Sequence, residues 1–113
     1  PEEVVDENVE FVVVEEMPVF RNGNADLMRY LSENIKYPTV SAEQGVQGRA
    51  VVQFVVGVHG EILNPVVVKS VDPYLDKEAI RVISSMPKWK PGKQRGKAVR
   101  VKYTVPVVFR LQS

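Results

Sequence analysis

The stretch "GRAVVQFVVGVHGEILNPVVVKS", residues 48–70, decides the fold because its apolar residues alternate with the period of a β-strand. At a spacing of two residues, one face of its first half carries Ala50, Val52, Phe54 and Val56. The segment "GVHGE" then supplies turn residues, and a second β-branched run follows it. These residues are therefore predicted to form a β-hairpin. Pro65 lacks a backbone donor, which indicates a bulge or an edge position in the second strand.

A helix and a long strand follow the hairpin. Residues 71–86, "VDPYLDKEAIRVISSM", have apolar residues at helical spacing, with Asp72 as the expected N-cap and Pro73 in the first turn. A basic loop is expected over residues 88–96. In the last strand, 97–109, one face is predicted to carry Val99, Val101, Tyr103, Val105, Val107 and Phe109.

These elements predict an α+β fold with a three-stranded antiparallel sheet and helices on one face. The helix returns the chain to the opposite end of the sheet, so the last strand runs antiparallel to the first. The simplest strand order is 2-1-3, with the first strand central and the last strand at an edge. Pro106 supports the edge position, since proline is excluded from central strands.

The N-terminal third is predicted to extend this core. Residues 1–8 are acidic and aperiodic and are expected to be a linker, and "VEFVVVEE" (9–16) is expected to be a strand. "ADLMRYLSENI" (25–35) has helical spacing, with Asn24 as the expected N-cap. The Tyr37-Pro38 pair ends that helix, and a short helical turn is expected after it.

The composition is that of one globular domain. The chain has 113 residues, of which 44% are hydrophobic and 26% charged, and no cysteine, which excludes disulfides and cysteine-based sites. No signal peptide and no apolar run of membrane-spanning length is present. Because the chain begins at Pro1 rather than Met, we expect it to be a piece of a longer protein.

The charges are segregated along the chain. Seven of the 14 acidic residues lie in residues 1–16, and eight of the 15 basic residues lie from Lys88 onward, where no acid occurs. A basic strand suggests nucleic acid or an acidic protein segment as partner. The net charge of +1 and the lack of a pair of stacking aromatic residues on the sheet face count against nucleic acid.

The sequence resembles the C-terminal periplasmic domain of TonB, the energy transducer of Gram-negative outer-membrane transport. The resemblance covers residues 37–111, and its most specific part is "MPKWKPG" (86–92), between a helix and an edge strand. The other matching residues are Tyr37-Pro38, Gly48, Val52, Phe54, Val56, Gly60, Ile62, Ser70, Leu75-Asp76, Glu78-Ala79, Gly96, Val99, Val101 and the closing "VPVVF". The upstream segment resembles the extension of Bacteroidetes-type members. The chain departs from the family at two places: Arg21-Asn22-Gly23 replaces a Pro-Gly-Gly-like turn in the upstream segment, and Pro65 replaces an aliphatic residue in the hairpin.

The resemblance implies an organisation and a location. It implies a linker (1–8), an N-terminal strand and helix extension (9–36) and a TonB C-terminal-like domain (37–113). The expected place is the periplasm, with an inner-membrane anchor in an absent N-terminal segment that also reaches an ExbB/ExbD-type motor. The resemblance leaves a homodimer open. The alternative parent is a membrane-bound regulatory metallopeptidase that uses this domain for sensing or docking.

The resemblance also implies a partner, the TonB box peptide of outer-membrane transporters. An edge strand can bind such a peptide by β-strand addition, with backbone bonds supplying the affinity. We expect no cofactor, no metal and no catalytic residue, and we expect pairing to stop near Pro106. The candidate partner-binding residues are Asn34, Lys97, Ala98, Val99, Arg100, Val101, Lys102, Tyr103, Thr104 and Val105.

Other conspicuous residues have structural interpretations. His59 is expected to be an exposed turn residue, and Trp89 to cover the edge of the core. Asp76 and Glu78 are interpreted as acids that complement the helix dipole. The outer face of the sheet is predicted to carry more apolar residues than a solvated face should: Val51, Val55, Val66, Val68 and Val108. Three covers remain open for it, namely the N-terminal strand, the helix after that strand, and a second copy of the domain.

Overall fold

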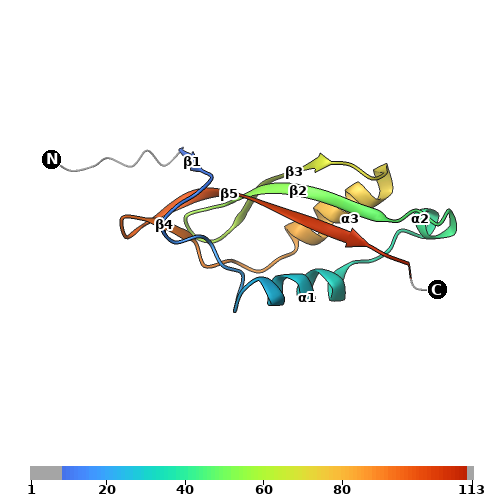
Figure 1. Cartoon of the computed structure of the whole chain (residues 1–113), viewed down its shortest axis with the longest axis horizontal. Coiled ribbons are helices and arrows are strands. Elements are labelled where there is room, and N and C mark those ends of the chain that lie inside the picture. The colour runs from blue at the N-terminus through green and yellow to red at the C-terminus, as the bar shows by residue number, and fades with distance from the viewer. Residues whose placement is uncertain (1–8, 112–113) are drawn as a thin grey trace.

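The computed structural model describes residues 9–111, so the expected acidic linker, residues 1–8, lies outside the described residues. The elements in chain order are β1 (Glu10–Phe11), α1 (Asn24–Asn34), α2 (Thr39–Glu43), β2 (Gly48–Val56), β3 (Ile62–Lys69), α3 (Pro73–Ser84), β4 (Gly92–Gln94) and β5 (Lys97–Phe109). Figure 1 shows the three long strands running together along the length of the molecule. No helix among residues 9–111 is long and apolar enough to cross a bilayer.

The sheet is mixed, in the order β1-β5-β2-β3, with β4 paired to β5. The three long strands have the predicted order, because β2 is central and pairs antiparallel with both β3 and β5. The prediction of a purely antiparallel three-stranded sheet is wrong in two respects. β1 adds a parallel partner to β5, and β4 adds a short antiparallel one.

Of the two additional strands, β4 comes from a segment predicted as a loop, and β1 from a segment predicted as a longer strand. The expected basic loop contains β4, which forms a tight hairpin with β5 through Arg95 and Gly96, at φ of 52° and 76°. Two consecutive residues with positive φ match the twist of a two-residue hairpin. The expected strand 9–16 is reduced to β1, followed by an isolated bridge between Glu16 and Lys93.

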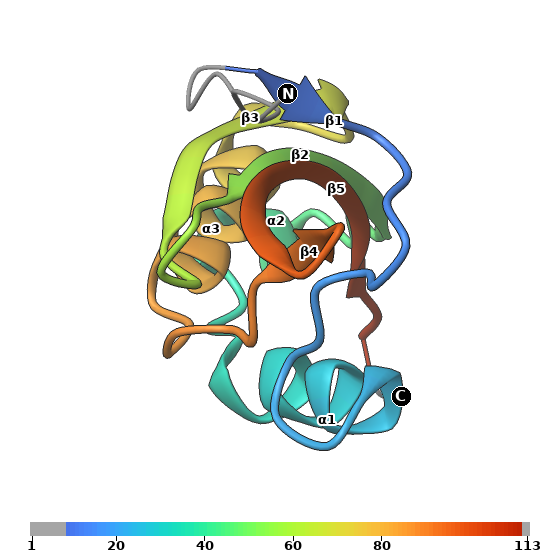
Figure 2. The ribbon, with the colours of Figure 1, turned by 90° about the vertical axis from the view of Figure 1, so that its left-hand side faces the viewer.

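The core lies between the inner face of the sheet and two helices. α3 buries one complete stripe, and α1 buries Leu27 and Leu31 in the same cluster as Val52 of β2 and Val105 of β5. Figure 2 shows both helices on the inner side of the curled sheet. The α3 side chains with no exposed surface are Leu75, Ala79, Val82 and Ile83. Burying each Leu, Ile or Val contributes about 1.5–3 kcal/mol, so this face anchors the domain.

The two longer helices begin differently. Asp72 caps α3 as predicted, because its Oδ1 accepts from the Leu75 N–H at 2.7 Å. The prediction of Asn24 as the N-cap of α1 is wrong. Gly23 occupies that position, with φ of 127°. Asp26, in the first turn of the helix, reaches back and accepts from the Asn22 N–H at 3.3 Å.

Pro65 lies where its chemistry predicts. β3 is the outer strand of the sheet opposite to β1, and its pairing with β2 shifts register between Gln53 and Val55. Asn64 has a positive φ of 50° at this irregularity. Because Pro65 lies at an edge strand and next to a bulge, no hydrogen bond of the ladder requires the backbone N–H that proline lacks.

Candidate functional site

The outer edge of β5

β5 is the longest strand, with 13 residues, and one of its two edges is continuously occupied. It pairs with β2 from Val101, opposite Val56, to Phe109, opposite Gly48. The predicted apolar face of β5 is confirmed, since five of its six side chains are at most 2% exposed and Tyr103 is half-buried. The other edge of β5 is therefore the place where a further strand can bind.

The chain itself supplies partners for the first part of β5. Lys97 to Val99 pair with β4, and Arg100 and Val101 pair with β1 in parallel. From Lys102 to Phe109, among the described residues, no strand lies on the edge away from β2. Of the nine consecutive candidate residues predicted from sequence, 97–105, Arg100 and Val101 thus have β1 on this edge, and Lys102 to Val105 have no described strand on it.

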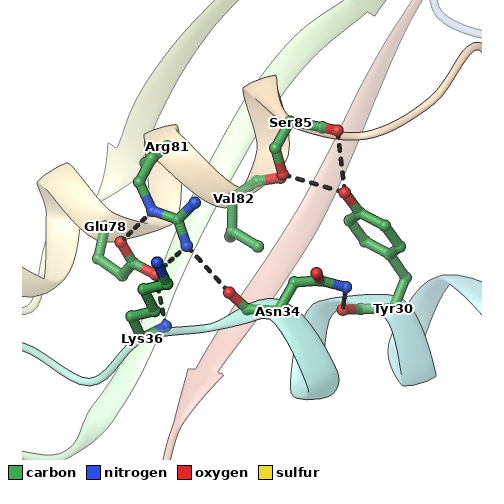
Figure 3. A network of polar contacts seen from close by, with 7 residues as sticks. All are labelled: Tyr30, Asn34, Lys36, Glu78, Arg81, Val82 and Ser85. Carbon is green, nitrogen blue, oxygen red and sulfur yellow. Dashed lines mark hydrogen bonds and ion pairs between the residues drawn. The ribbon is translucent and has the colours of Figure 1, made fainter.

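The tenth candidate, Asn34, lies elsewhere. It is the last residue of α1, and its carbonyl oxygen accepts from Arg81 Nη2 of α3 at 2.9 Å. Its side-chain amide donates to the Tyr30 carbonyl within the helix. Figure 3 shows Asn34 facing α3, on the side where Glu78 and Arg81 of that helix lie. The structure therefore gives Asn34 a role in joining two helices and does not bring it to the β5 edge.

A small second core fixes the position of the N-terminal segment at the start of β5. Val14 packs with Val99 and Val101, all at most 7% exposed, and Phe11 packs against them half-buried. Further along, the segment forms two-way backbone bonds between Val19 and Lys90, at 3.0 and 2.8 Å. The segment before α1 is thus bound along the end of the sheet at which β4 and β5 meet.

Acidic residues of this segment meet the basic stretch. Glu10 of β1 lies 3.8 Å from the Lys102 ammonium group. Glu15 accepts from the Arg95 N–H at 3.3 Å, and its own N–H donates to the side chain of Gln94 at 3.1 Å. This contact was not predicted from sequence, although opposite charges at the two ends of a short domain were a signal for it.

One of the outer-face valines is buried, and Glu10 of the N-terminal strand lies near it. Val55 is only 5% exposed, and a pocket of about 180 Å³ beside it is lined by Glu10, Gln53, Asn64 and Lys102. α1 lies on the inner face and covers none of this group. The outer-face valines that stay at least 42% exposed are Val66, Val68 and Val108.

Trp89 occupies the core side of the same region. Its ring packs against Phe20, Phe54 and Tyr103, with centroids 5.0–5.7 Å away, and it is 3% exposed. The prediction that it covers the core edge is confirmed. Its buried indole N–H has no hydrogen-bond partner among residues 9–111, and an adjacent pocket of about 140 Å³ is lined by Trp89 and Tyr103.

Comparison with known proteins

The fold defines a small α+β domain in which a hairpin, a helix and a long last strand form one curled sheet. The chain belongs to the TonB C-terminal domain family. The family described as Gram-negative bacterial TonB protein C-terminal matches residues 33–111. This family is non-catalytic, its domain is periplasmic in TonB proteins, and membership implies interaction with outer-membrane transporters.

A solved structure supports the same fold. The NMR solution structure of the Helicobacter pylori TonB C-terminal domain matches with a TM-score of 0.61 and 21% sequence identity. The match covers 79% of this chain and 94% of that one. No curated protein sequence matches the chain.

Proposed function

We propose that this domain binds the N-terminal box peptide of outer-membrane transporters by β-strand addition at the outer edge of β5. In this proposal the domain belongs to a periplasmic energy transducer and acts without catalysis. An N-terminal anchor in the inner membrane and an ExbB/ExbD-type motor supply the energy. A peptide bound along a strand loads several backbone bonds together, which suits the transmission of a pulling force.

The observation that carries the proposal is the pairing of β1. An extended segment with an acidic residue already lies parallel to β5 at Arg100 and Val101, so the edge is able to bind such a strand. Beyond it, Lys102 to Val105 continue the edge without a strand partner among residues 9–111. We infer that a transporter peptide uses these four residues together with the part that β1 holds.

The side chains along this edge fit a partner chosen mainly through its backbone. Lys102 and Thr104 are exposed on the outer face, while the inner-face residues of β5 belong to the core. Backbone pairing demands little of the peptide's sequence, which suits one domain that serves several transporters. The basic side chains steer an acidic peptide toward the edge and oppose pairing between copies.

A scan of peptide N-methylation tests this function while the protein stays unchanged. The probe is a synthetic N-terminal peptide of an outer-membrane transporter from the source organism, methylated at one backbone nitrogen at a time. In a strand, every second N–H points to the partner strand. Methylation at alternate positions should therefore weaken binding about tenfold, equivalent to about 1.4 kcal/mol, and methylation between them should change little.

The matched control is the same peptide with alanine at each position in turn. Alanine keeps the N–H and removes the side chain, so its effects should be smaller than those of methylation at the alternate positions. A flat methylation profile, or a profile that follows the alanine scan, would show that side chains carry the recognition and would refute strand addition.

A further inference from the structure

The segment Val9–Val14, called the resident strand below, is bound at the edge that the proposed function assigns to a transporter peptide. Its pairing with β5 is short, because only Glu10 and Phe11 have strand partners. The ion pair from Glu10 to Lys102 joins side chains that are 30% and 43% exposed, and such exposed pairs contribute little. The resident strand is thus held at few points.

Its remaining attachment is apolar and one-sided. Phe11 and Val14 contact Val99 and Val101, whereas Val12 and Val13 are 66% and 78% exposed. Removing the resident strand would expose Val101, which is fully buried now. Such apolar surface favours replacement of the strand by another one over an empty edge.

We propose that the resident strand and the transporter peptide are alternative occupants of one edge, so that docking proceeds by exchange. This inference rests on the proposed function, since it concerns the same edge. The resident strand also defines its competitor: an extended peptide parallel to β5, with an acid near Lys102 and bulky apolar residues that replace Phe11 and Val14. The domain on its own is then partly self-inhibited.

A reversible lock tests the exchange. The chain has no cysteine, so Glu10→Cys with Lys102→Cys introduces a unique pair that a short cleavable bis-maleimide can join. The labelled transporter peptide is titrated into the joined form and then into the same sample after cleavage. Exchange predicts binding at least tenfold weaker in the joined form and recovery after cleavage. Equal affinity before and after cleavage would overturn the proposal.

A loosened strand provides the opposite change. Phe11→Ser removes the aromatic contact with Val99 and Val101, and Val13→Ser is its matched control, because Val13 is 78% exposed. Phe11→Ser should bind the transporter peptide several-fold more tightly than the parent, and Val13→Ser should equal the parent. Weaker binding by a folded Phe11→Ser variant would show that the resident strand assists docking, and would overturn the proposal.

A second probe separates this inference from the proposed function. The synthetic peptide "VEFVVVEE", residues 9–16, is titrated into the parent and into Phe11→Ser. If it binds the loosened variant more tightly while no transporter peptide binds any form, the edge exchanges strands but the proposed function fails. If neither peptide binds and Phe11→Ser becomes a dimer in sedimentation, the edge takes a second copy and exchange with a peptide is refuted.

Discussion

At the scale of single residues, the tip of the hairpin depends on one glycine. Gly60 has φ of 81°, its N–H donates to the Gly57 carbonyl, and its carbonyl accepts from the Trp89 N–H at 2.8 Å. A Cβ at Gly60 would collide with the backbone carbonyl of Trp89. The hairpin turn and the segment that leads to β4 are therefore in contact only because no side chain stands there.

Alanine at Gly60 is predicted to destabilise the domain strongly. The conformation alone costs about 1–2 kcal/mol for a residue with a Cβ, and the collision adds to it. Gly96→Ala is the control, because Gly96 has a similar φ of 76° and open space around it. Urea unfolding should give a loss for Gly60→Ala that exceeds that of Gly96→Ala by about 2 kcal/mol or more. Equal losses would show that the contact with Trp89 is unimportant.

Residue-level predictions from sequence succeeded where one residue's chemistry determines the outcome. Asp72, Pro65 and Trp89 are examples, since a cap, a missing donor and a large ring restrict the position directly. Asn24 failed as a cap because Gly23 accepts the first intrahelical bond, from Leu27, one residue earlier. Asn34 could not be placed, since its partner Arg81 is distant in sequence and only the packing of α1 on α3 joins them.

At the scale of elements, a buried carboxylate joins α1 to α3. Glu78 accepts from Arg81 at 2.6 and 2.7 Å and from the Lys36 N–H just beyond α1 at 2.6 Å. Arg81 then reaches the Asn34 carbonyl (Figure 3). Burial alone would raise the pKa of Glu78, but the hydrogen bonds from Arg81 and Lys36 and the Arg81 charge together lower it below its ordinary value. Glu78 thus acts between helices, beyond the dipole role expected from sequence.

Glu78→Gln is predicted to reduce stability by about 1–3 kcal/mol at neutral pH, because the buried donors lose a charged acceptor. A depressed folded-state pKa gives stability that is present above the unfolded pKa, about 4.3, and is lost as the pH falls through the lower folded value. The difference in the free energy of unfolding between the parent and Glu78→Gln, measured with urea, should therefore shrink below about pH 4. A difference that stays constant down to about pH 2 would contradict the lowered pKa of Glu78.

Elements with a regular period were predictable, and elements defined by a partner were not. β2, β3, α3 and β5 follow from spacing and turn residues within one stretch. β1 and β4 depend on which edge of β5 is available, and a β-branched or basic sequence contains no such information. The one local signal missed was Arg95-Gly96, which suits a two-residue hairpin.

At the scale of the whole molecule, the segregated charges acquire a spatial meaning. The acidic N-terminal segment and the basic C-terminal stretch are apart in sequence but contact each other where β1, β4 and β5 meet. Lys97 and Arg100 lie at the same end of β5. An acidic peptide that approaches the edge therefore meets a basic surface that the resident strand only partly neutralises.

Charge reversal near the edge of β5 should slow docking and leave the fold unchanged. Lys97→Glu with Arg100→Glu is predicted to slow association with an acidic transporter peptide, and the effect should shrink as salt increases. Lys69→Glu with Lys77→Glu is the control, since both side chains are exposed on β3 and α3. Stopped-flow fluorescence measures the rates. Equal slowing in both variants would show that only the net charge of the domain matters, and not the position of the charges. Tight, salt-sensitive binding of DNA or RNA by the parent would favour a nucleic-acid partner.

Amide hydrogen exchange with and without the transporter peptide tests the central claim most directly, because it locates the backbone groups that the peptide covers. The account predicts new protection at alternate amides of Lys102–Val105, on the edge that no described strand occupies. The other open edge of the sheet, β3, should not change. Protection along β3 with none on β5 would contradict strand addition at the last strand.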